Sequence, residues 1–590
     1  MVQHDGDTDA DANTNTNTNT YTTKDPQTIL TSIFNHRSFR SKQKAIIENV
    51  LANRDTLAIL PTGAGKSLCF QIPALMFEGL TIVVSPLIAL MKDQVDGLRK
   101  KGIHEVAYLN SALQEAAKER IYALLKRSRL KILYVAPETF VDNKLMSIFR
   151  QCNISLIAID EVHCISVWGH NFRPDYLRLG RVIKALHNPP VLGLTATATE
   201  KVQEDIQKQL GIRCDVFKDS FDRKNLLFSV IRLESENKKR ELLIKFLEQL
   251  EGSAIIYVNF TRTAEDLAKF LTRNGLNARY YHGQIEDKEE RGNIQNEFIS
   301  GKTRIAVATN AFGMGIDKED IRAIIHYNLP KSIENYYQEV GRAGRDGKEA
   351  YCILLYSKLD EIRLRKLIQY STPSMKQIRA VMGLLERGIG NVLYVNEKRI
   401  ARELKLNEVL MRIILYQLER MNAIKTYFRV FRHAAVTVRM AESPQVQAYT
   451  PEVGKILDDA YFKTNIWLNL EILSGSTGIS VSRLNNILRD MRNAGLIELV
   501  ERDFCTPVRV YPAIKKIDML ELQETFWRLE ESGLKKIEKV VEYVNSVECK
   551  RKFILNYFGE AHDGRCNACS ICNPQLRELE SFQDANLSLS

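Results

Sequence analysis

The sequence predicts an α/β chain in which two parallel-sheet domains come first and a helical part with a cysteine cluster comes last. Three observations support this fold class. Continuous apolar runs alternate with helical patterns as far as residue 356, the pattern then becomes mainly helical, and four cysteines fall between Cys549 and Cys572. Apolar strands separated by amphipathic helices are typical of parallel sheets covered on both faces. With 590 residues, of which 45% are hydrophobic, the chain is long enough for about four domains.

The pattern divides the chain into consecutive parts. They are a disordered N-terminal tail rich in Asp, Asn and Thr (1–24), a nucleotide-binding α/β domain (25–214), a second α/β domain (215–356), a winged-helix-like module (357–442), a second such module (443–515), a helical segment with the cysteines (516–575) and a C-terminal tail (576–590). The first tail has almost no apolar residues, so burial cannot offset the entropy lost on ordering it. The strand-like runs are DTLAIL, TIVVSP, ILYVAP, LIAID and VLGLTAT in the first α/β domain, and AIIYVN, RIAVAT and AIIHYN in the second.

Two segments in the helical part repeat one pattern of short helix, turn, longer basic helix and β-rich ribbon, at residues 397–438 and 479–511. This order is typical of a winged helix, in which a helix-turn-helix precedes a β-hairpin wing, although two ordinary helical cores remain an alternative. Basic side chains on such modules are candidates for phosphate contacts. Here they are Arg412, Arg420, Lys425, Arg429 and Arg432, with Tyr427, Phe428 or Phe431 as a candidate wedge against a base pair.

The net charge of +11 and the isoelectric point near 9.0 favour a polyanionic partner such as nucleic acid, although a basic surface can also serve solubility. Apolar runs such as the one from Thr81 are far shorter than the roughly 20 residues that a spanning helix needs, and the N-terminus has no signal pattern. We therefore expect neither a membrane nor secretion. The scattered cysteines outside the cluster fit a reducing intracellular compartment, which is the cytoplasm or nucleoid of a prokaryote or the nucleus of a eukaryote.

A phosphate-binding loop is predicted at residues 61–67, where a strand runs into PTGAGKS and then into an apolar helix start. Gly63 and Gly65 let backbone N–H groups close on phosphates, Lys66 reaches the β- and γ-phosphates, and the Ser67 hydroxyl can hold Mg²⁺. Thr62 belongs to the same loop. Leu60 occupies the position where the strict motif has glycine, and a glycine-rich turn alone can be purely structural.

Two adjacent carboxylates, Asp160 and Glu161, follow the apolar strand LIAID. A strand end of this kind can place Asp160 on a magnesium ion and Glu161 on the attacking water in phosphoryl transfer. Carboxylates at strand ends are also common as solvated loop residues. Their order and spacing after Lys66 favour the nucleotide hydrolase.

The second α/β domain contributes Gln338, Arg342 and Arg345 in the string YYQEVGRAGRDG. An arginine supplied by a neighbouring domain stabilises γ-phosphate charge only when the domains close, so hydrolysis becomes coupled to motion between domains. Arginines beside glycines are otherwise ordinary turn residues. Together with Lys66, Asp160 and Glu161, these three residues are the predicted catalytic set.

Nine ordered strings resemble the helicase motifs of the RecQ family. They are LPTGAGKS, SPLIALMKDQ, YVAPE, DEVHCISVWGHNFRPDY, TATAT, FDRKNL, YYHGQ, VATNAFGMGIDK and QEVGRAGRDG. The resemblance covers about residues 34–347 and resumes at the cysteine cluster. It implies two tandem RecA-like domains that use ATP and Mg²⁺ to move on DNA in the 3′ to 5′ direction.

The resemblance also implies nucleotide contacts outside the phosphate loop. The string FNHRSFRSKQ is similar to the family's adenine-recognition motif, so Arg40 and Gln43 would contact the base edge. The family usually has glycine and tyrosine where this chain has Asn35 and His36, and His36 would stack on the adenine. Gly315 and Asp317 match a family motif that bridges nucleotide and DNA backbone.

Residues that couple DNA binding to hydrolysis are implied in the same way. HCISVWGHNFRPDY resembles the family's aromatic-rich loop, in which Trp168 and Phe172 offer faces for base stacking and Arg173 can pair with phosphate. The other residues implied to act in this coupling are His163, Thr195 and Thr309. Without the neighbouring motif, packing in the core would be the usual role of such aromatic residues.

The last cysteines follow the pattern C-x16-C-x2-C-x2-C at Cys549, Cys566, Cys569 and Cys572. Four thiolates at this spacing suit a closed tetrahedral Zn²⁺ site, and an iron–sulfur cluster shares the same ligands. The segment also resembles the RecQ zinc-binding segment. The order departs from the family, in which this segment directly follows the second motor domain and precedes a single winged helix.

The expected function is an ATP-dependent 3′ to 5′ DNA helicase acting in DNA repair or recombination, with ATP, Mg²⁺ and Zn²⁺ as cofactors. We expect single-stranded and duplex DNA in forked or tailed form as partners, a monomeric chain, and single-strand-binding or repair proteins as further partners. Two other functions stay open, namely an RNA helicase of the same superfamily and an architectural or annealing DNA-binding protein with a residual nucleotide switch. A DNA-stimulated ATPase that Glu161→Gln abolishes would exclude the second.

Overall fold

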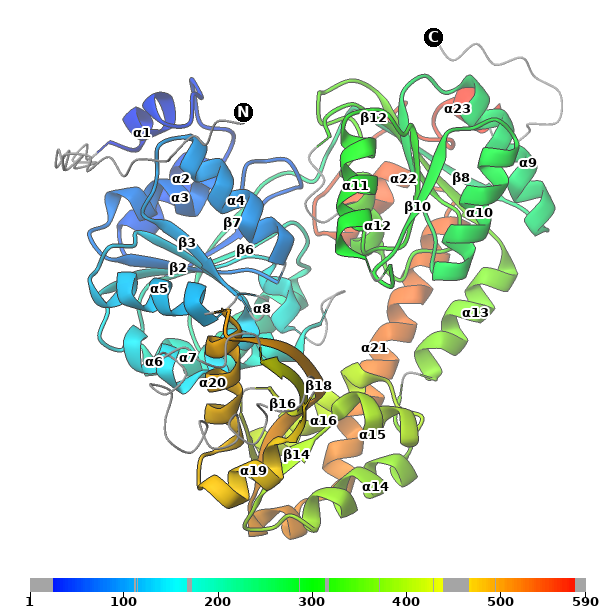
Figure 1. The fold of residues 1–590 in the computed structure, drawn as a ribbon. Helices are drawn as coiled ribbons and strands as arrows, with labels where there is room; N and C mark the ends of the chain where they lie inside the picture. The colour runs from blue at the N-terminus through cyan, green and yellow to red at the C-terminus, as the bar shows by residue number, and fades with distance from the viewer. Residues whose placement is uncertain are drawn as a thin grey trace, which may run out of the picture.

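The computed structural model describes residues 25–86, 88–110, 113, 115–166, 172–285, 287–312, 318–370, 372–427, 429–438, 466–493 and 495–578. The chain forms two α/β domains side by side, a stalk of two helices, and a winged-helix unit beneath them (Figure 1). The predicted tail at 1–24, most of the predicted tail at 576–590, and the predicted residues Trp168, Gly315 and Asp317 lie outside the described residues.

The first domain is built on a seven-stranded parallel sheet in the order β3-β4-β2-β5-β6-β1-β7. Its strands are β1 (Thr56–Ile59), β2 (Leu80–Val84), β3 (Val106–Leu109), β4 (Ile132–Val135), β5 (Ile154–Ile159), β6 (Val191–Thr195) and β7 (Asp215–Lys218). Leu57 and Ile59 enter one apolar cluster and Ala58 and Leu60 the other, because alternate side chains of a strand point to opposite faces. Burial on both faces is the outcome expected from continuous apolar runs.

Helices cover both faces of this sheet. They are α1 (Pro26–Ser32), α2 (Gln43–Leu51), α3 (Leu68–Met76), α4 (Ile88–Lys100), α5 (Glu115–Lys126), α6 (Asn143–Phe149), α7 (Leu179–Ala185) and α8 (Glu200–Leu210), with short 3₁₀ turns η1 (Pro137–Val141), η2 (Val162–Ile165) and η3 (Pro174–Arg178). The sheet continues through β7 to Lys218, beyond the predicted domain boundary at residue 214. The difference arises because β7 is a short and partly exposed edge strand without a continuous apolar run.

The second domain has a six-stranded parallel sheet in the order β10-β11-β9-β12-β13-β8. Its elements are β8 (Leu226–Arg232), α9 (Glu236–Gln249), β9 (Ser253–Tyr257), α10 (Thr261–Arg273), β10 (Ala278–Tyr281), α11 (Lys288–Ile299), β11 (Ile305–Ala308), β12 (Ile321–His326), α12 (Ile333–Val340) and β13 (Ala350–Tyr356). The two parallel sheets confirm the predicted fold class.

A stalk of two helices, α13 (Lys358–Gln369) and α21 (Met519–Asn545), leads away from the second domain (Figure 1). The helices come close where Gly533 of α21 meets Ile368 of α13, because a Cβ on Gly533 would lie only 3.0 Å from Ile368 Cγ2. After α21 the chain returns to the second domain as α22 (Lys550–Tyr557) and α23 (Pro574–Glu578). The cysteine segment therefore rests on the second domain although about 190 residues separate them along the chain.

The winged-helix unit lies between the two stalk helices in the sequence. It consists of α14 (Met375–Glu386), β14 (Val392–Val395), α15 (Glu397–Glu403), α16 (Glu408–Arg420), β15 (Ile424–Thr426), β16 (Val430–Val438), β17 (Ile466–Asn469), α19 (Leu470–Thr477), α20 (Val481–Asn493), β18 (Ile497–Val510) and η4 (Pro512–Lys516). One antiparallel sheet in the order β14-β18-β16-β17 joins these elements, and β15 also pairs with β18.

The two predicted winged-helix modules are interleaved through β18. The first part of this 14-residue strand pairs with β16, and its last part pairs with β14 and β15. The structure therefore differs from the expectation of two successive modules, because the strands of the first module pair with a strand that belongs to the second.

The winged-helix unit also touches the first domain. Arg178, at the end of η3, donates through Nη2 to Glu419 Oε2 at 3.0 Å and to Thr426 Oγ1 at 2.8 Å. Helix α20 likewise packs on α5. The two domains, the stalk and the winged-helix unit thus form a closed ring of contacts (Figure 1). Among the described residues, no helix is both long and apolar enough to cross a membrane.

Candidate functional site

The phosphate-binding loop follows β1 and leads into α3. Gly63 and Gly65 have φ values of +85° and +75°, which explains the need for glycine at both positions. Lys66 Nζ donates to Leu60 O at 3.3 Å, so the ammonium lies across the loop where a phosphate would sit. Leu60 itself is buried in the core and contributes its carbonyl, so the departure from glycine at this position leaves the loop intact.

The segment predicted to recognise adenine is attached to this loop. Gln43 Nε2 donates to the carbonyls of Ala64 at 2.9 Å and Gly65 at 3.0 Å. Arg40 Nη1 donates to Gly63 O at 3.0 Å, and its backbone N–H donates to Gln43 Oε1 at 2.8 Å. These bonds place Arg40 and Gln43 at the edge of the loop.

His36, the third residue predicted to bind adenine, is exposed beside Asn35. Asn35 adopts a φ of +57°. Asparagine tolerates this left-handed conformation better than other non-glycine residues, so it can replace the glycine that is usual in the family.

Asp160 and Glu161 lie at the end of β5, next to Lys66. Burial, followed by the charge of Glu161, raises the pKa of Asp160 to about 7, although the Lys66 charge opposes the shift. Burial also raises the pKa of Glu161, although the positive charges of Lys66, Arg342 and Arg173 oppose this shift. Two adjacent buried carboxylates with raised pKa values favour binding of a cation.

Ser67 and Asp160 are the residues that would hold a magnesium ion, since both border one small, mainly apolar cavity beside α3. Bound there with a nucleotide, the ion would neutralise phosphate charge. The Glu161 backbone has a φ of +49°, a left-handed conformation that is uncommon for glutamate. Glu161 stays the candidate to orient the attacking water, because its carboxylate interacts with the charges of Lys66 and Arg342 at this site.

The second domain contacts the phosphate loop through residues 341–347, which we name the arginine loop. A Cβ on Gly341 would lie 3.4 Å from Thr62 Oγ1, and a Cβ on Gly63 would lie 3.9 Å from Arg345 Cγ. Arg342 is buried, and its charge opposes the rise in the pKa of Glu161 that burial causes. Lys66, Glu161, Arg342 and Arg345 therefore meet at one interdomain site, and Gln338 lies on α12 directly before the loop.

His163 connects the carboxylates to the TATAT string. Its Nδ1 lies 2.9 Å from Thr195 Oγ1 and 3.3 Å from Glu161 Oε2. Burial, followed by the charges of Lys66 and Arg173, lowers the pKa of His163 to about 3, so the ring is neutral at physiological pH. Nδ1 hydrogen-bonds Thr195 and also faces Glu161 Oε2, so a movement of Glu161 at the nucleotide can alter the bond between His163 and Thr195. Thr309 lies further away, at the end of β11 in the second domain.

The described end of the aromatic-rich loop packs between two units. Arg173 Nη1 donates to Pro86 O at 2.9 Å. Phe172 is partly buried and packs against both the core of the first domain and the core of the winged-helix unit. In this arrangement its ring supports an interdomain contact, and base stacking by Phe172 stays a prediction.

Two of the basic winged-helix residues are held in ion pairs. Arg412 Nε lies 3.1 Å from Glu397 Oε2, and Arg432 lies 2.8 Å from Glu471 and 3.4 Å from Asp503. Pairing with a carboxylate reduces the charge that each arginine can offer to a phosphate. Arg412 and Arg432 therefore contribute to the unit's own structure.

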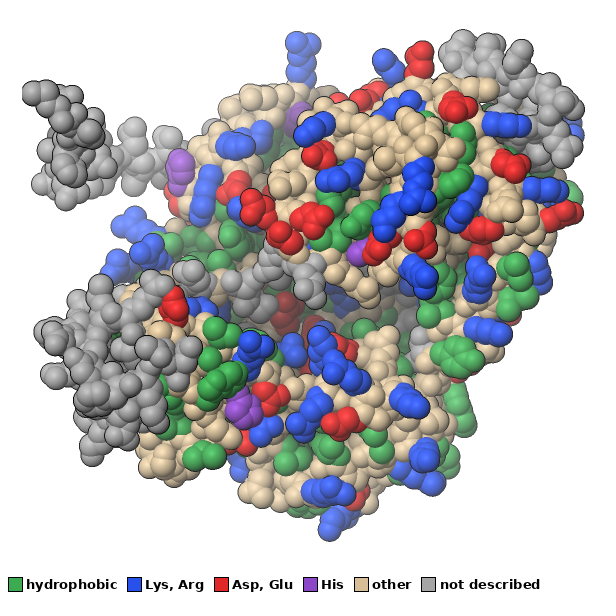
Figure 2. Space-filling model, turned by 45° about the vertical axis from the view of Figure 1, so that its right-hand side comes forward, with side chains coloured by type: hydrophobic (Ala, Val, Ile, Leu, Met, Phe, Trp, Pro, Cys, Tyr) green, Lys and Arg blue, Asp and Glu red, His purple; other side chains and the backbone are tan. Residues whose placement is uncertain are grey.

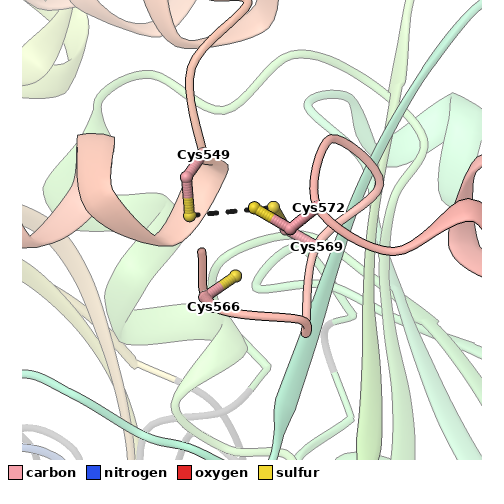
Figure 3. A group of neighbouring side chains, drawn as sticks. All are labelled: Cys549, Cys566, Cys569 and Cys572. Carbon is pink, nitrogen blue, oxygen red and sulfur yellow. Dashed lines mark hydrogen bonds between the residues drawn. The ribbon is translucent and has the colours of Figure 1, made fainter. Parts of the chain in front are cut away.

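The four cysteines predicted as metal ligands converge at the C-terminal end of the fold (Figure 3). The sulfur atoms of Cys549, Cys566, Cys569 and Cys572 all lie within 4.8 Å of one another. A hydrogen bond from Cys566, together with backbone N–H groups, lowers the pKa of Cys569 to about 4. Backbone N–H groups also point at Cys549 Sγ and Cys566 Sγ, at 3.5 and 3.4 Å. This set of thiol donors fits a tetrahedral Zn²⁺ ion.

Sequence reasoning missed several polar residues that reach the interdomain site. Arg223 and Asn225, in the linker between the domains, bond the arginine loop, and Arg551 of α22 bonds the linker. The only signal was the string FDRKNL. The string marked the resemblance without indicating a contact, because the partners lie more than 100 positions away along the chain.

Comparisons with known proteins agree with this geometry. The model of DEAD/DEAH box helicases matches residues 40–206, that of the helicase conserved C-terminal domain matches 238–347, and that of RecQ zinc-binding matches 516–573. The crystal structure of the DUF1998 helicase MrfA bound to DNA covers 59% of this chain and 53% of its own, with 19% identity and a TM-score of 0.49. That likeness is too weak to support an argument.

Two bacterial relatives are similar over most of the motor region. ATP-dependent DNA helicase RecQ of Pasteurella multocida is 42% identical over 356 residues, which is 60% of this chain and 56% of the relative. The probable ATP-dependent DNA helicase RecS of Bacillus subtilis is 41% identical over 367 residues, which is 62% of this chain and 73% of the relative. The chain spans little more than half the length of several relatives. With the motor motifs, the cysteine cluster and this identity together, the chain belongs to the RecQ family of ATP-dependent DNA helicases.

Proposed function

We propose that the protein is an ATP-dependent helicase that moves 3′ to 5′ along single-stranded DNA and unwinds duplex DNA. The observation that carries this proposal is the contact between the arginine loop of one α/β domain and the phosphate loop of the other. A nucleotide bound there would touch both domains. Its hydrolysis and release would then change how the domains sit against each other, which is the event that a translocating motor requires.

The proposed substrate is single-stranded DNA continuing into a duplex, as in a fork or a tailed end. Figure 2 shows Lys and Arg side chains on both sides of the hollow between the upper and lower parts of the molecule. In the winged-helix unit, Lys398, Arg402 and Lys405 are exposed. Such charges attract phosphates over distances of about a Debye length, near 8 Å at physiological salt.

The biological setting is proposed from the family. We propose that the protein acts as a monomer in DNA repair or recombination, inside the cell, alongside single-strand-binding or repair proteins. The net charge of +11 supports a nucleic-acid partner in general and no particular pathway.

Strand separation with ATP and Mg²⁺ tests the motor and its direction together. Fluorescent duplexes carrying a 3′ or a 5′ single-stranded tail would be compared for wild type, Lys66→Ala and Lys44→Ala. Lys44 is an exposed lysine of α2 and serves as the matched control. We expect unwinding from the 3′ tail alone, lost in Lys66→Ala and kept in Lys44→Ala.

Unwinding from the 5′ tail would overturn the proposed direction. DNA-stimulated ATP hydrolysis without unwinding from either tail would replace the helicase with a translocase or remodeller. An RNA duplex with the same sequence provides a further arm, and stronger stimulation by RNA than by DNA would favour the RNA helicase.

A further inference from the structure

The interdomain linker holds the backbone of the arginine loop through Arg223. Its Nη2 donates to the carbonyls of Ala343 at 3.0 Å and Gly344 at 2.9 Å, and its Nη1 donates to Gly341 O at 3.4 Å. These carbonyls lie on either side of Arg342 and directly before Arg345. A planar guanidinium presents its donors from two Nη atoms in a fixed fork and can hold three carbonyls in one geometry, whereas a lysine would have to reach all three from a single nitrogen on a flexible stem.

Asn225 reinforces the same contact from the next turn of the linker. Its Nδ2 donates to Gly344 O at 2.8 Å and to Lys348 O at 2.7 Å. Gly344 has a φ of +56°, and a Cβ at this position would lie only 2.4 Å from Asn225 Nδ2. The loop can therefore approach the linker this closely only with glycine at position 344.

The linker is in turn held by Arg551 of α22, a residue that is only 4% exposed. Its Nη1 bonds Asp222 Oδ1 and donates to Arg223 O at 2.8 Å, and its Nη2 donates to Leu226 O at 2.7 Å and to Lys224 O at 3.2 Å. The buried guanidinium thus bonds three backbone carbonyls and one carboxylate oxygen within residues 222–226. Loss of this side chain would leave several of these groups without a partner.

Arg551 is itself fixed by its position in the cysteine segment. It lies two residues after Cys549, and its guanidinium stacks over the Phe228 ring with 5.6 Å to the centroid. The backbone of Phe228 in β8 pairs with the segment through two 2.9 Å bonds, from its N–H to Ala568 O and from Ser570 N–H to its carbonyl. The segment is therefore joined directly to the strand that follows the linker.

We propose that Arg223 is a positioning residue for Arg342 and Arg345, and that Arg551 anchors the linker from which Arg223 acts. These contacts form a continuous path from α22 through the linker and the arginine loop to the phosphate loop. This inference rests on the proposed ATP-driven function. Arg223 shifts the arginines toward the site only through the loop backbone, so its loss lowers the rate of hydrolysis more than the affinity for ATP.

The test measures DNA-stimulated ATP hydrolysis by Arg223→Lys, Arg223→Met and Arg551→Lys. Lys224→Met is the matched control, because Lys224 is the exposed neighbour of Arg223. For the Arg223 and Arg551 variants we expect kcat to fall by about tenfold or more, with KM for ATP within about threefold of wild type. The control should stay within about twofold.

Nucleotide binding separates a positioning role from a purely structural one. A fluorescent ADP should bind the variants as tightly as wild type, while ADP with aluminium fluoride, a mimic of the transition state, should bind at least about tenfold more weakly. A fold defect alone would weaken both ligands together. Circular dichroism and zinc content identify a variant that has not folded. If Arg223→Met does not fold, Arg223→Lys and Arg551→Lys provide the test.

A double variant tests whether Arg223 acts through the arginines. If it does, Arg223→Lys will have much less effect in an Arg345→Ala background than in wild type. Effects that multiply in the double variant would overturn the inference. An active wild type with unaffected Arg223 variants would also overturn it while leaving the proposed function standing, whereas a wild type without DNA-stimulated ATPase activity would overturn both.

Discussion

Asp160 is a residue whose charge depends strongly on its surroundings. Its pKa of about 7 lies above the ordinary value of 3.8 because burial and Glu161 disfavour the charged form. The folded state therefore holds a proton that the unfolded state has already released between these two pH values. Without a metal, this residue makes the fold less stable as the pH rises from about 4 to about 7.

Replacement of Asp160 by asparagine should remove this loss of folding stability at high pH, because asparagine does not ionise. We expect Asp160→Asn to raise the melting temperature at pH 8 in buffer without magnesium by roughly 2–4 °C, which corresponds to about 1 kcal/mol in a domain of this size. ATP hydrolysis should be lost in the same variant. Differential scanning calorimetry at pH 5 and pH 8 measures the effect, and a stabilisation that is larger at pH 5 than at pH 8 would contradict it.

At the scale of elements, the cysteine segment makes its own contribution to the fold. Chelation of zinc or Cys566→Ser should lower the stability of the C-terminal region and leave both α/β sheets formed. Cys214, a partly exposed cysteine outside the cluster, provides the control substitution Cys214→Ser. Thermal unfolding followed together with bound zinc tests this expectation, and an unchanged melting curve after both treatments would count against a structural metal.

The stalk depends on close approach of its two helices. Gly533→Leu should destabilise it by about 1–3 kcal/mol, because the side chain would collide with Ile368 at the crossing point. Gly475 in α19 has nothing within 4 Å of its Cβ position, so Gly475→Ala should be neutral or stabilising by up to about 1 kcal/mol. Denaturant titrations compare the two, and equal effects would mean that Gly533 has no special packing role.

Strands with continuous apolar runs could be predicted from sequence, as β1, β2 and β5 illustrate. The interleaved sheet could not, because β18 pairs both with β16 and with β14, whose residues lie more than 100 positions earlier, and its alternating pattern fits a wing of either module. In the candidate site, Lys66, Asp160 and Glu161 were predictable because motif spacing reflects local geometry. Arg223 and Arg551 were not, because most of their partners are backbone carbonyls, which leave no mark on the sequence.

At the scale of the whole molecule, one ion pair closes the ring of contacts. Arg178 and Glu419 are 20% and 15% exposed, so removing one partner should cost about 1–3 kcal/mol of docking free energy. Arg178→Glu should therefore release the winged-helix unit from the first domain and increase the radius of gyration measured by small-angle X-ray scattering. The double variant Arg178→Glu/Glu419→Arg should restore docking and the wild-type radius of gyration. An enlarged radius in the double variant would indicate that other contacts hold the unit.

The crossing of Ile368 and Gly533 has a consequence for how such a chain can change over evolution. The backbone leaves the motor beside one of these residues and returns beside the other, so along the chain the winged-helix unit is joined to the motor only at this crossing, while its surface docks on the first domain. A gene segment inserted there, or deleted from there, would leave both α/β sheets and the cysteine cluster with their neighbours intact. The unusual order of domains in this protein is therefore compatible with two unaltered α/β domains. Variation between relatives would concentrate in the winged-helix unit at the end of the stalk.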